Sequence, residues 1–227
     1  RSYLACPGSV AALTRLAETW IDNDRLEEAE RLAAAWTEAA PSDAAAWALL
    51  GKLTAARSPA EAGAALERSL SLDPEAGQPL LGLLTATRAE GAPAVLAAEV
   101  GQAFLRTGQW TLAAASLEHA LELDPGQARA RAFLGLARAQ RGGSGIAEAQ
   151  AALAMTPNDP AILAIYASLL RQSGQPAAAR DELLAAAEVA PADPGIAAEL
   201  GATYAALGDL PSALAAYQHA VLAAPDD

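Results

Sequence analysis

Residues 94–125, AVLAAEVGQAFLRTGQWTLAAASLEHALELDP, decide the fold of this chain. Apolar side chains recur in them at intervals of three and four residues, which is the spacing of one face of an α-helix. Gly108 interrupts the pattern and permits a tight turn, while Pro125 stops the second segment. The stretch therefore predicts two helices joined by a short turn.

The same phrase recurs along the chain at a nearly fixed period. Seven prolines mark it: Pro7, Pro41, Pro74, Pro125, Pro157, Pro191 and Pro225. Five of the six intervals between them lie within two residues of 34, and the sixth, 51, is one and a half periods. A period of this size is typical of a solenoid of stacked repeats, whose function is usually binding along a surface.

Individual positions also agree between copies. With residue 94 as position 1, positions 8, 11, 15, 20, 24 and 27 are Gly101, Phe104, Gly108, Ala113, Leu117 and Ala120. In the copy that ends at Pro225 they are Gly201, Tyr204, Gly208, Ala213, Tyr217 and Ala220. Small residues at positions 8, 20 and 27 let paired helices approach closely, and large residues fill the space between layers.

This pattern resembles the tetratricopeptide repeat (TPR) over nearly the whole chain. The resemblance implies an all-α fold, a right-handed α-solenoid of about six helix pairs. Repeats 1 and 2 are expected in residues 10–76, and repeats 3 to 6 in residues 94–227. Residues 77–93 have room for one unpaired helix, which should alter the stacking there. Residues 1–7 are interpreted as the end of a preceding repeat, so the sequence is taken as a fragment of a longer array.

Two segments depart from the pattern. Trp36 stands in repeat 1 where a small residue is expected, and it is predicted to fill a wider gap near the end of the stack. In repeat 4, Gly142, Gly143, Ser144 and Gly145 replace the usual turn between helices. This run is interpreted as a flexible turn, because it lacks the glycine spacing of a phosphate-binding loop.

Composition sets further limits. No stretch approaches 18 uninterrupted apolar residues, so no membrane span is expected. Cys6 is the one cysteine, which excludes an internal disulfide or a site of several cysteines. Fourteen arginines against one lysine suggest a bacterial source with a GC-rich genome. The sequence leaves the compartment open between cytoplasm and periplasm.

The net charge of −12 disfavours nucleic acid as a partner, but the charges are unevenly distributed. First helices and their turns carry eleven basic and seven acidic residues, while 20 of the 27 acidic residues lie on second helices and linkers. The TPR resemblance places first helices along a concave groove, so it implies a locally positive groove and an acidic convex face. The residues proposed to bind a partner there are Lys52, Arg88, Gln102, Arg106, Arg131, Arg138 and Arg171. The alternative is that these side chains are merely solvated.

No set of side chains indicates catalysis, a metal or a cofactor. His119 and His219 lie three repeats apart at an outward position and are interpreted as surface residues. No phosphate loop, HExxH or CxxC motif occurs. Trp110, in the turn of repeat 3, is either an exposed anchor or a cover for the edge of a helix pair. The Lys and Asn clamp of chaperone-binding TPR proteins cannot be assembled from these first helices.

Three functions stay open. The favoured one is a non-enzymatic scaffold that holds a protein or peptide partner, expected to be extended and acidic, in its groove. The second is a periplasmic docking or spacer region of a larger envelope machine, such as a cellulose-type exopolysaccharide export subunit. The third is a substrate-recruiting appendage of a larger enzyme.

Overall fold

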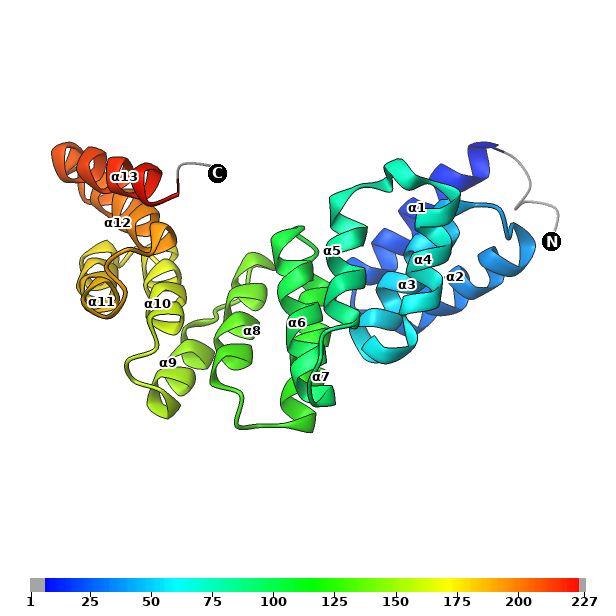
Figure 1. The fold of residues 1–227 in the computed structure, drawn as a ribbon, viewed down its shortest axis with the longest axis horizontal. Coiled ribbons are helices and arrows are strands. Elements are labelled where there is room, and N and C mark those ends of the chain that lie inside the picture. The colour runs from blue at the N-terminus through cyan, green and yellow to red at the C-terminus, as the bar shows by residue number, and fades with distance from the viewer. Residues whose placement is uncertain (1–6, 225–227) are drawn as a thin grey trace. The chain divides into compact units, whose positions relative to one another are not determined.

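The computed structural model describes residues 7–224, with side chains from residue 10 onward except Ala76. Within this range all regular secondary structure is helical, in thirteen α-helices and two short 3₁₀ turns (Figure 1). The all-α prediction is therefore confirmed, as is the packing of consecutive helices in pairs. The chain divides into two compact units, residues 1–125 and 126–227, called unit 1 and unit 2 below.

Unit 1 contains three helical hairpins and one single helix. The hairpins are α1 (Pro7–Asp22) with α2 (Leu26–Ala39), α3 (Ala44–Arg57) with α4 (Gly63–Leu72), and α6 (Pro93–Arg106) with α7 (Trp110–Leu123). The single helix α5 (Gln78–Thr87) lies in the predicted 77–93 segment and packs against α4 and α6. The turns η2 (Pro59–Glu61) and η3 (Pro74–Ala76) flank α4. Of the proposed preceding repeat, residues 1–6 lie outside the described part, and Pro7 begins α1.

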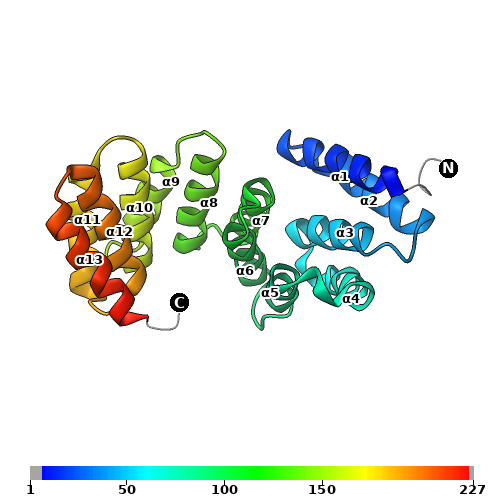
Figure 2. The ribbon, with the colours of Figure 1, turned by 90° about the horizontal axis from the view of Figure 1, so that it is seen from above.

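Helix α3 is the centre of unit 1. It contacts α2, α4, α5, α6 and α7, an arrangement visible in Figure 2. Its sequence has almost no polar face, as expected of a helix that is covered on several sides. Leu53, Ala55 and Ala56 are fully buried in it. Helix α7 is the second helix of its pair, yet it packs against α3, which is the first helix of another pair.

Unit 2 is a run of three hairpins. They are α8 (Ala128–Gln140) with α9 (Ile146–Met155), α10 (Pro160–Gln172) with α11 (Pro176–Val189), and α12 (Pro194–Leu207) with α13 (Leu210–Ala223). Each second helix except α13 also packs against the following first helix. Leu163, Leu183 and Ile196 meet in one hydrophobic cluster built from α10, α11 and α12.

Helix starts follow rules that are readable in the sequence. The Asp159 and Asp193 side chains accept hydrogen bonds from backbone N–H groups in the first turns of α10 and α12. Pro160 and Pro194 occupy the next position, where a missing N–H costs nothing. Such caps fix where each hairpin begins.

Close helix contacts explain two glycines. A Cβ atom at Gly101 would lie 2.6 Å from Cγ of Leu117, so the large residue at position 24 packs directly on position 8 of the same repeat. In repeat 4 the contact is tighter, because a Cβ atom at Gly145 would lie 1.9 Å from the carbonyl oxygen of Gly135. The glycine run that was expected to be a flexible turn thus includes a packing position between α8 and α9.

Trp36 is fully buried in α2 and its indole Nε1 donates to Asp43 Oδ2 at 3.1 Å. Asp43 is also the N-cap of α3, since its other oxygen accepts from Ala45 N–H at 3.0 Å. The tryptophan was predicted to fill a gap near the end of the stack. In the structure it is buried, and its hydrogen bond also ties α2 to the start of α3.

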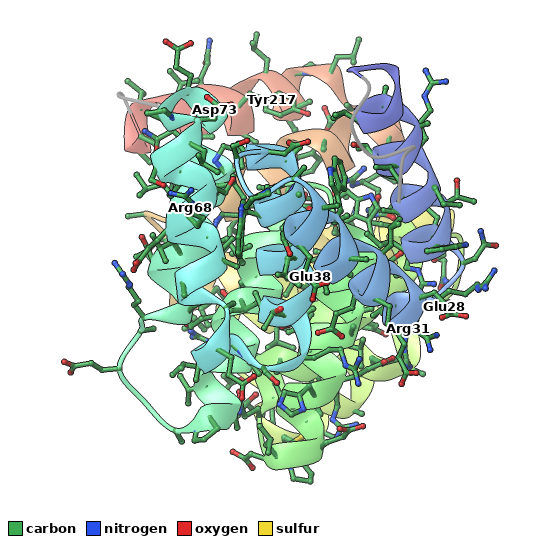
Figure 3. All side chains as sticks on the ribbon, turned by 90° about the vertical axis from the view of Figure 1, so that its right-hand side faces the viewer. Glu28, Arg31, Glu38, Arg68, Asp73 and Tyr217 are labelled. Atoms are coloured by element: carbon green, nitrogen blue, oxygen red, sulfur yellow. The ribbon has the colours of Figure 1, made fainter. Side chains whose placement is uncertain are left out.

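Second helices project charged side chains into solvent, as Glu38 of α2 and Arg68 of α4 show in Figure 3. Among the described residues no helix combines the length and apolar character needed to cross a bilayer.

Candidate functional site: an acidic cleft in unit 1

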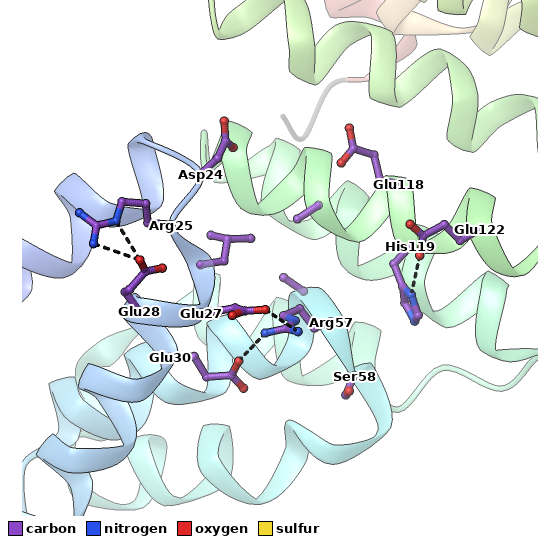
Figure 4. Close-up of a pocket in the computed structure, with 13 residues that line it drawn as sticks. Asp24, Arg25, Glu27, Glu28, Glu30, Arg57, Ser58, Glu118, His119 and Glu122 are labelled. Atoms are coloured by element: carbon purple, nitrogen blue, oxygen red, sulfur yellow. Dashed lines mark hydrogen bonds and ion pairs between the residues drawn. The ribbon is translucent and has the colours of Figure 1, made fainter.

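A cleft of about 790 Å³ lies in unit 1, between the start of α2, the end of α3 and one side of α7 (Figure 4). Its wall is mostly charged. The residues that form it are Asp24, Arg25, Leu26, Glu27, Glu28, Glu30, Ala56, Arg57, Ser58, Ala115, Glu118, His119 and Glu122.

Asp24 takes a special backbone position at the edge of the cleft. It lies in the turn between α1 and α2 with φ of 59°, and it is the only non-glycine residue in residues 7–224 with positive φ. The corresponding turn residues in other repeats include Gly108, Gly174 and Gly208, all with positive φ. Aspartate tolerates this conformation better than most residues do, at a cost of roughly 1 kcal/mol. Repeat 1 therefore has a carboxylate where these other repeats have none.

Two arginines bind carboxylates of the wall. Arg57, the last residue of α3, donates to Glu30 of α2 at 2.9 Å and lies 3.9 Å from Glu27. Arg25 binds Glu28 at 3.0 Å and stacks over the Trp20 ring, 5.5 Å from its centroid. The hydrogen bond from Arg25 lowers the pKa of the Glu28 carboxyl. Both arginines are thus already paired inside the cleft.

Helix α7 supplies the opposite side with Glu118, His119 and Glu122. His119 Nδ1 lies 3.8 Å from Glu122 Oε2, and the imidazole is partly exposed in the wall. The sequence interpretation of His119 as a simple surface residue missed this location. Six carboxylates face two guanidinium groups, so the concavity has a negative potential that attracts cations.

Three of the seven residues predicted to bind a partner make ion pairs within their own unit. Arg88 binds Glu67 of α4, and Arg138 binds Glu148 of α9. Arg171 of α10 donates to Glu199 of α12 at 2.9 Å, which joins two first helices. Pairing reduces the positive charge that these arginines offer to an incoming anion.

The other four have different surroundings. Lys52 is half-buried on α3, and burial lowers the pKa of its amine while the charge of Glu18 acts in the opposite direction. Arg106 is exposed at the end of α6 and makes no ion pair within residues 7–224, and Gln102 is half-buried on the same helix. Arg131 is half-buried on α8 in unit 2. None of the seven lines the cleft.

The sequence contains one signal for the cleft. The single helix in residues 77–93 predicts altered stacking, but not that α7 would face α3. Without that contact, the carboxylates of α2 and α7 are predicted to lie on the acidic convex face.

Comparison with known proteins agrees with this architecture. The family model described as "Tetratricopeptide repeat" matches residues 5–53. Residues 5–53 therefore match the tetratricopeptide-repeat family, and the helical hairpins continue through the rest of the described chain. A search of curated proteins gives no significant match.

Solved TPR structures share the fold at low sequence identity. A chain of the APC/C hetero-tetramer Cut9-Hcn1 is 18% identical with a TM-score of 0.55, over 95% of this chain and 39% of that one. TTC0263, a thermophilic TPR protein of Thermus thermophilus, is 18% identical with a TM-score of 0.54, over 82% of this chain and 93% of that one. A TPR protein from Parabacteroides merdae is 16% identical with a TM-score of 0.51, over 98% of this chain and 82% of that one.

Proposed function

We propose that this TPR protein is a non-catalytic interaction scaffold whose acidic cleft binds a positively charged segment of a partner protein. The fold supports the general role, because helical repeats of this kind form extended binding surfaces. The composition of the cleft wall supports the specific role, which is binding of a positively charged segment. It holds six carboxylates and two arginines, and both arginines are already paired with carboxylates of the wall.

A volume of about 790 Å³ is within the range of ligand-binding pockets in proteins. Arginine is the best match for such a wall, since its planar guanidinium group donates two parallel hydrogen bonds to one carboxylate. Glu118 and Glu122, one turn apart on α7, face the carboxylates of α2 across the cleft (Figure 4). A basic segment in the cleft would therefore have carboxylates on both sides.

Fluorescence polarisation with a labelled peptide of alternating Arg and Ser tests this proposal. We expect the double variant Glu118→Lys, Glu122→Lys to weaken binding by about tenfold or more, which corresponds to about 1.4 kcal/mol. The matched control is Glu182→Lys, Glu188→Lys on α11, because it changes the net charge equally and Glu188 has the repeat position of Glu122.

The control separates site binding from general attraction. A chain of charge −12 attracts any polycation, and both double variants weaken this general attraction equally. The control variant reports this general effect alone, which should weaken binding by no more than about twofold. Equal weakening by both double variants refutes the cleft as the site. Circular dichroism spectra that match the wild type would show that either variant remains folded.

A second candidate keeps the acidic partner that the sequence suggested. The observation that favours it is Arg106, which is exposed on a first helix and has no ion pair within residues 7–224. Under this hypothesis a peptide of alternating Glu and Ser binds, and Arg106→Glu abolishes its binding, while Arg68→Glu on the outward side of α4 does not. If the acidic peptide does not bind at all, this candidate is rejected.

Two wider roles inferred from the sequence stay hypotheses. They are a docking region of a larger envelope machine and a substrate-recruiting appendage of an enzyme. A pull-down from the source cell with the wild type and the Glu118→Lys, Glu122→Lys variant would identify partners that depend on the cleft.

A further inference from the structure

His119 is the residue of the cleft wall whose type changes charge close to neutral pH. The chain has two histidines: His119 of α7 lines the cleft, while His219 of α13 lies exposed in unit 2. Histidine is the side chain that ordinarily gains or loses its proton between about pH 5 and 8. Aspartate and glutamate ordinarily titrate near pH 4, and arginine stays charged throughout. Mild acidification therefore changes the charge of the cleft wall through His119.

Two carboxylates of α7, those of Glu118 and Glu122, lie beside His119 (Figure 4). The histidine side chain is 32% exposed, and its Nδ1 atom lies 3.8 Å from Oε2 of Glu122. That distance is too long for a hydrogen bond, so a neutral imidazole leaves the Glu122 carboxylate available to a ligand. A protonated imidazole attracts this carboxylate and needs only a small movement to form a charge-assisted hydrogen bond with it.

The charged groups that face His119 across the cleft come from α3, from the start of α2 and from the turn before α2. Helix α3, which packs on α7, contributes Arg57, and this guanidinium group is already bound to Glu30. Helices α1 and α6 also pack on α7, but none of the cleft-lining residues belongs to them. The remaining charged groups of the facing wall are Asp24, Arg25, Glu27 and Glu28.

The cleft therefore has four more negative than positive charges when the imidazole is neutral, and protonation of His119 reduces this excess to three. Protonation also engages Glu122, which a guanidinium group of a ligand would otherwise bind. Both effects act against a basic ligand.

We propose that the acidic cleft is a pH-dependent binding site, in which protonation of His119 weakens the hold on a basic partner segment. This inference rests on the proposed function, because it concerns the same site and the same class of partner. A unit charge several ångströms from a bound guanidinium group, in a partly solvated cleft, lowers the affinity about threefold to tenfold.

Binding and protonation oppose each other reciprocally. A bound basic segment disfavours the imidazolium form, so its binding should release protons to the buffer near pH 6.5 and release almost none near pH 8. Isothermal titration calorimetry in two buffers of different ionisation enthalpy measures this release. The His119→Gln variant should show no release at either pH.

The direct test measures the affinity of the alternating Arg and Ser peptide at about pH 8 and about pH 5.5, at fixed ionic strength. The peptide has blocked termini and a label that does not titrate in this range, so its own charge stays constant. The quantity compared is the ratio of the two dissociation constants within each variant, which removes any change in absolute affinity. For the wild type, the dissociation constant should be about threefold to tenfold higher at the lower pH.

Three variants isolate the histidine. His119→Gln cannot be protonated, so its ratio should fall below about twofold. His119→Lys stays positively charged at both pH values, so its ratio should also be flat, and at pH 8 it should bind more weakly than His119→Gln. The matched control is His219→Gln, because His219 has the same repeat position on α13, and it should keep the wild-type ratio.

Equal ratios in the wild type and in His119→Gln overturn this inference. So does a His119→Lys variant that binds as tightly as His119→Gln at pH 8. The proposed function is judged separately at pH 8, by the Glu118→Lys, Glu122→Lys variant against its control. If that variant weakens binding selectively while the two ratios are equal, the cleft is the site and only its pH dependence is wrong. If it does not, both proposals are rejected.

Discussion

The contact between Gly135 and Gly145 gives the sharpest test of the packing in unit 2. Replacement of Gly145 by alanine would place a Cβ atom 1.9 Å from the Gly135 carbonyl oxygen, 2.3 Å from its carbon and 2.7 Å from its Cα. Real Cβ atoms essentially never approach within 3.0 Å, so α8 and α9 must separate by about 1.1 Å. All three opposing atoms are backbone, so no side chain can rotate away.

Overpacking usually costs about 1–3 kcal/mol, and a clash with backbone belongs at the upper end of that range. We therefore expect Gly145→Ala to destabilise unit 2 by about 3 kcal/mol. In a unit of about 100 residues this lowers the melting temperature by about 12–24 °C. The glycine is required by the approach of the backbones and not by its φ, which is −110°.

The assay can separate the two units because tryptophan occurs in one of them. Trp20, Trp36, Trp47 and Trp110 all lie before residue 126, so tryptophan emission reports on unit 1 while ellipticity at 222 nm reports on all helices. Gly145→Ala should lower the transition seen by ellipticity and leave the emission transition in place. Gly82→Ala is the matched control, because nothing lies within 4 Å of its Cβ position and alanine in a helix is better by up to about 1 kcal/mol. If Gly145→Ala is as stable as the wild type, the close approach of α8 and α9 is wrong.

Three further predictions concern stability and are read from urea unfolding. Trp36→Ala should cost about 3–5 kcal/mol, because it empties a fully buried site and removes the bond to Asp43; a loss below about 1 kcal/mol would contradict this burial. Asp193→Ala should cost about 1 kcal/mol through loss of the α12 cap, with Asp193→Asn close to the wild type. Burial lowers the pKa of Lys52, so the unfolded chain binds that proton more tightly and stability rises with pH between the lowered pKa and the ordinary lysine value. The Lys52→Met variant should be more stable than the wild type at neutral pH, and its stability should lack this rise with pH. If the free energy of unfolding has the same slope against pH in the variant and the wild type between pH 7 and 10, the burial of Lys52 is contradicted.

The hairpins were predictable because their signals are local. Helical spacing, the glycine at position 8, the N-cap aspartates and the period of the prolines all act within one repeat or between neighbours. Gly101 illustrates this, since its contact with Leu117 lies inside one repeat and follows from the pattern alone. Trp36 was harder, because its partner Asp43 lies in a linker that the pattern treats as variable.

The charge arrangement was not predictable to the same degree. Arg171 and Glu199 are 28 residues apart, and Arg57 and Glu30 are 27 apart, on different helices. Whether two such side chains meet depends on helix rotation, which the repeat pattern fixes only roughly. Counting basic residues on first helices therefore overstated the positive charge that these helices offer to a partner.

The single helix α5 explains why an acidic cleft forms in unit 1. In a regular run of hairpins, first helices pack beside first helices and second helices keep to the other side, as α8, α10 and α12 do in unit 2. One added helix breaks this alternation, so that α7, a second helix, packs against α3, a first helix. Second helices and linkers hold 20 of the 27 acidic residues, and the carboxylates of α2 and α7 therefore come to share one concavity. The cationic side chains in that concavity are Arg57 at the end of α3 and Arg25 in the turn before α2, and two guanidinium groups are too few to neutralise six carboxylates.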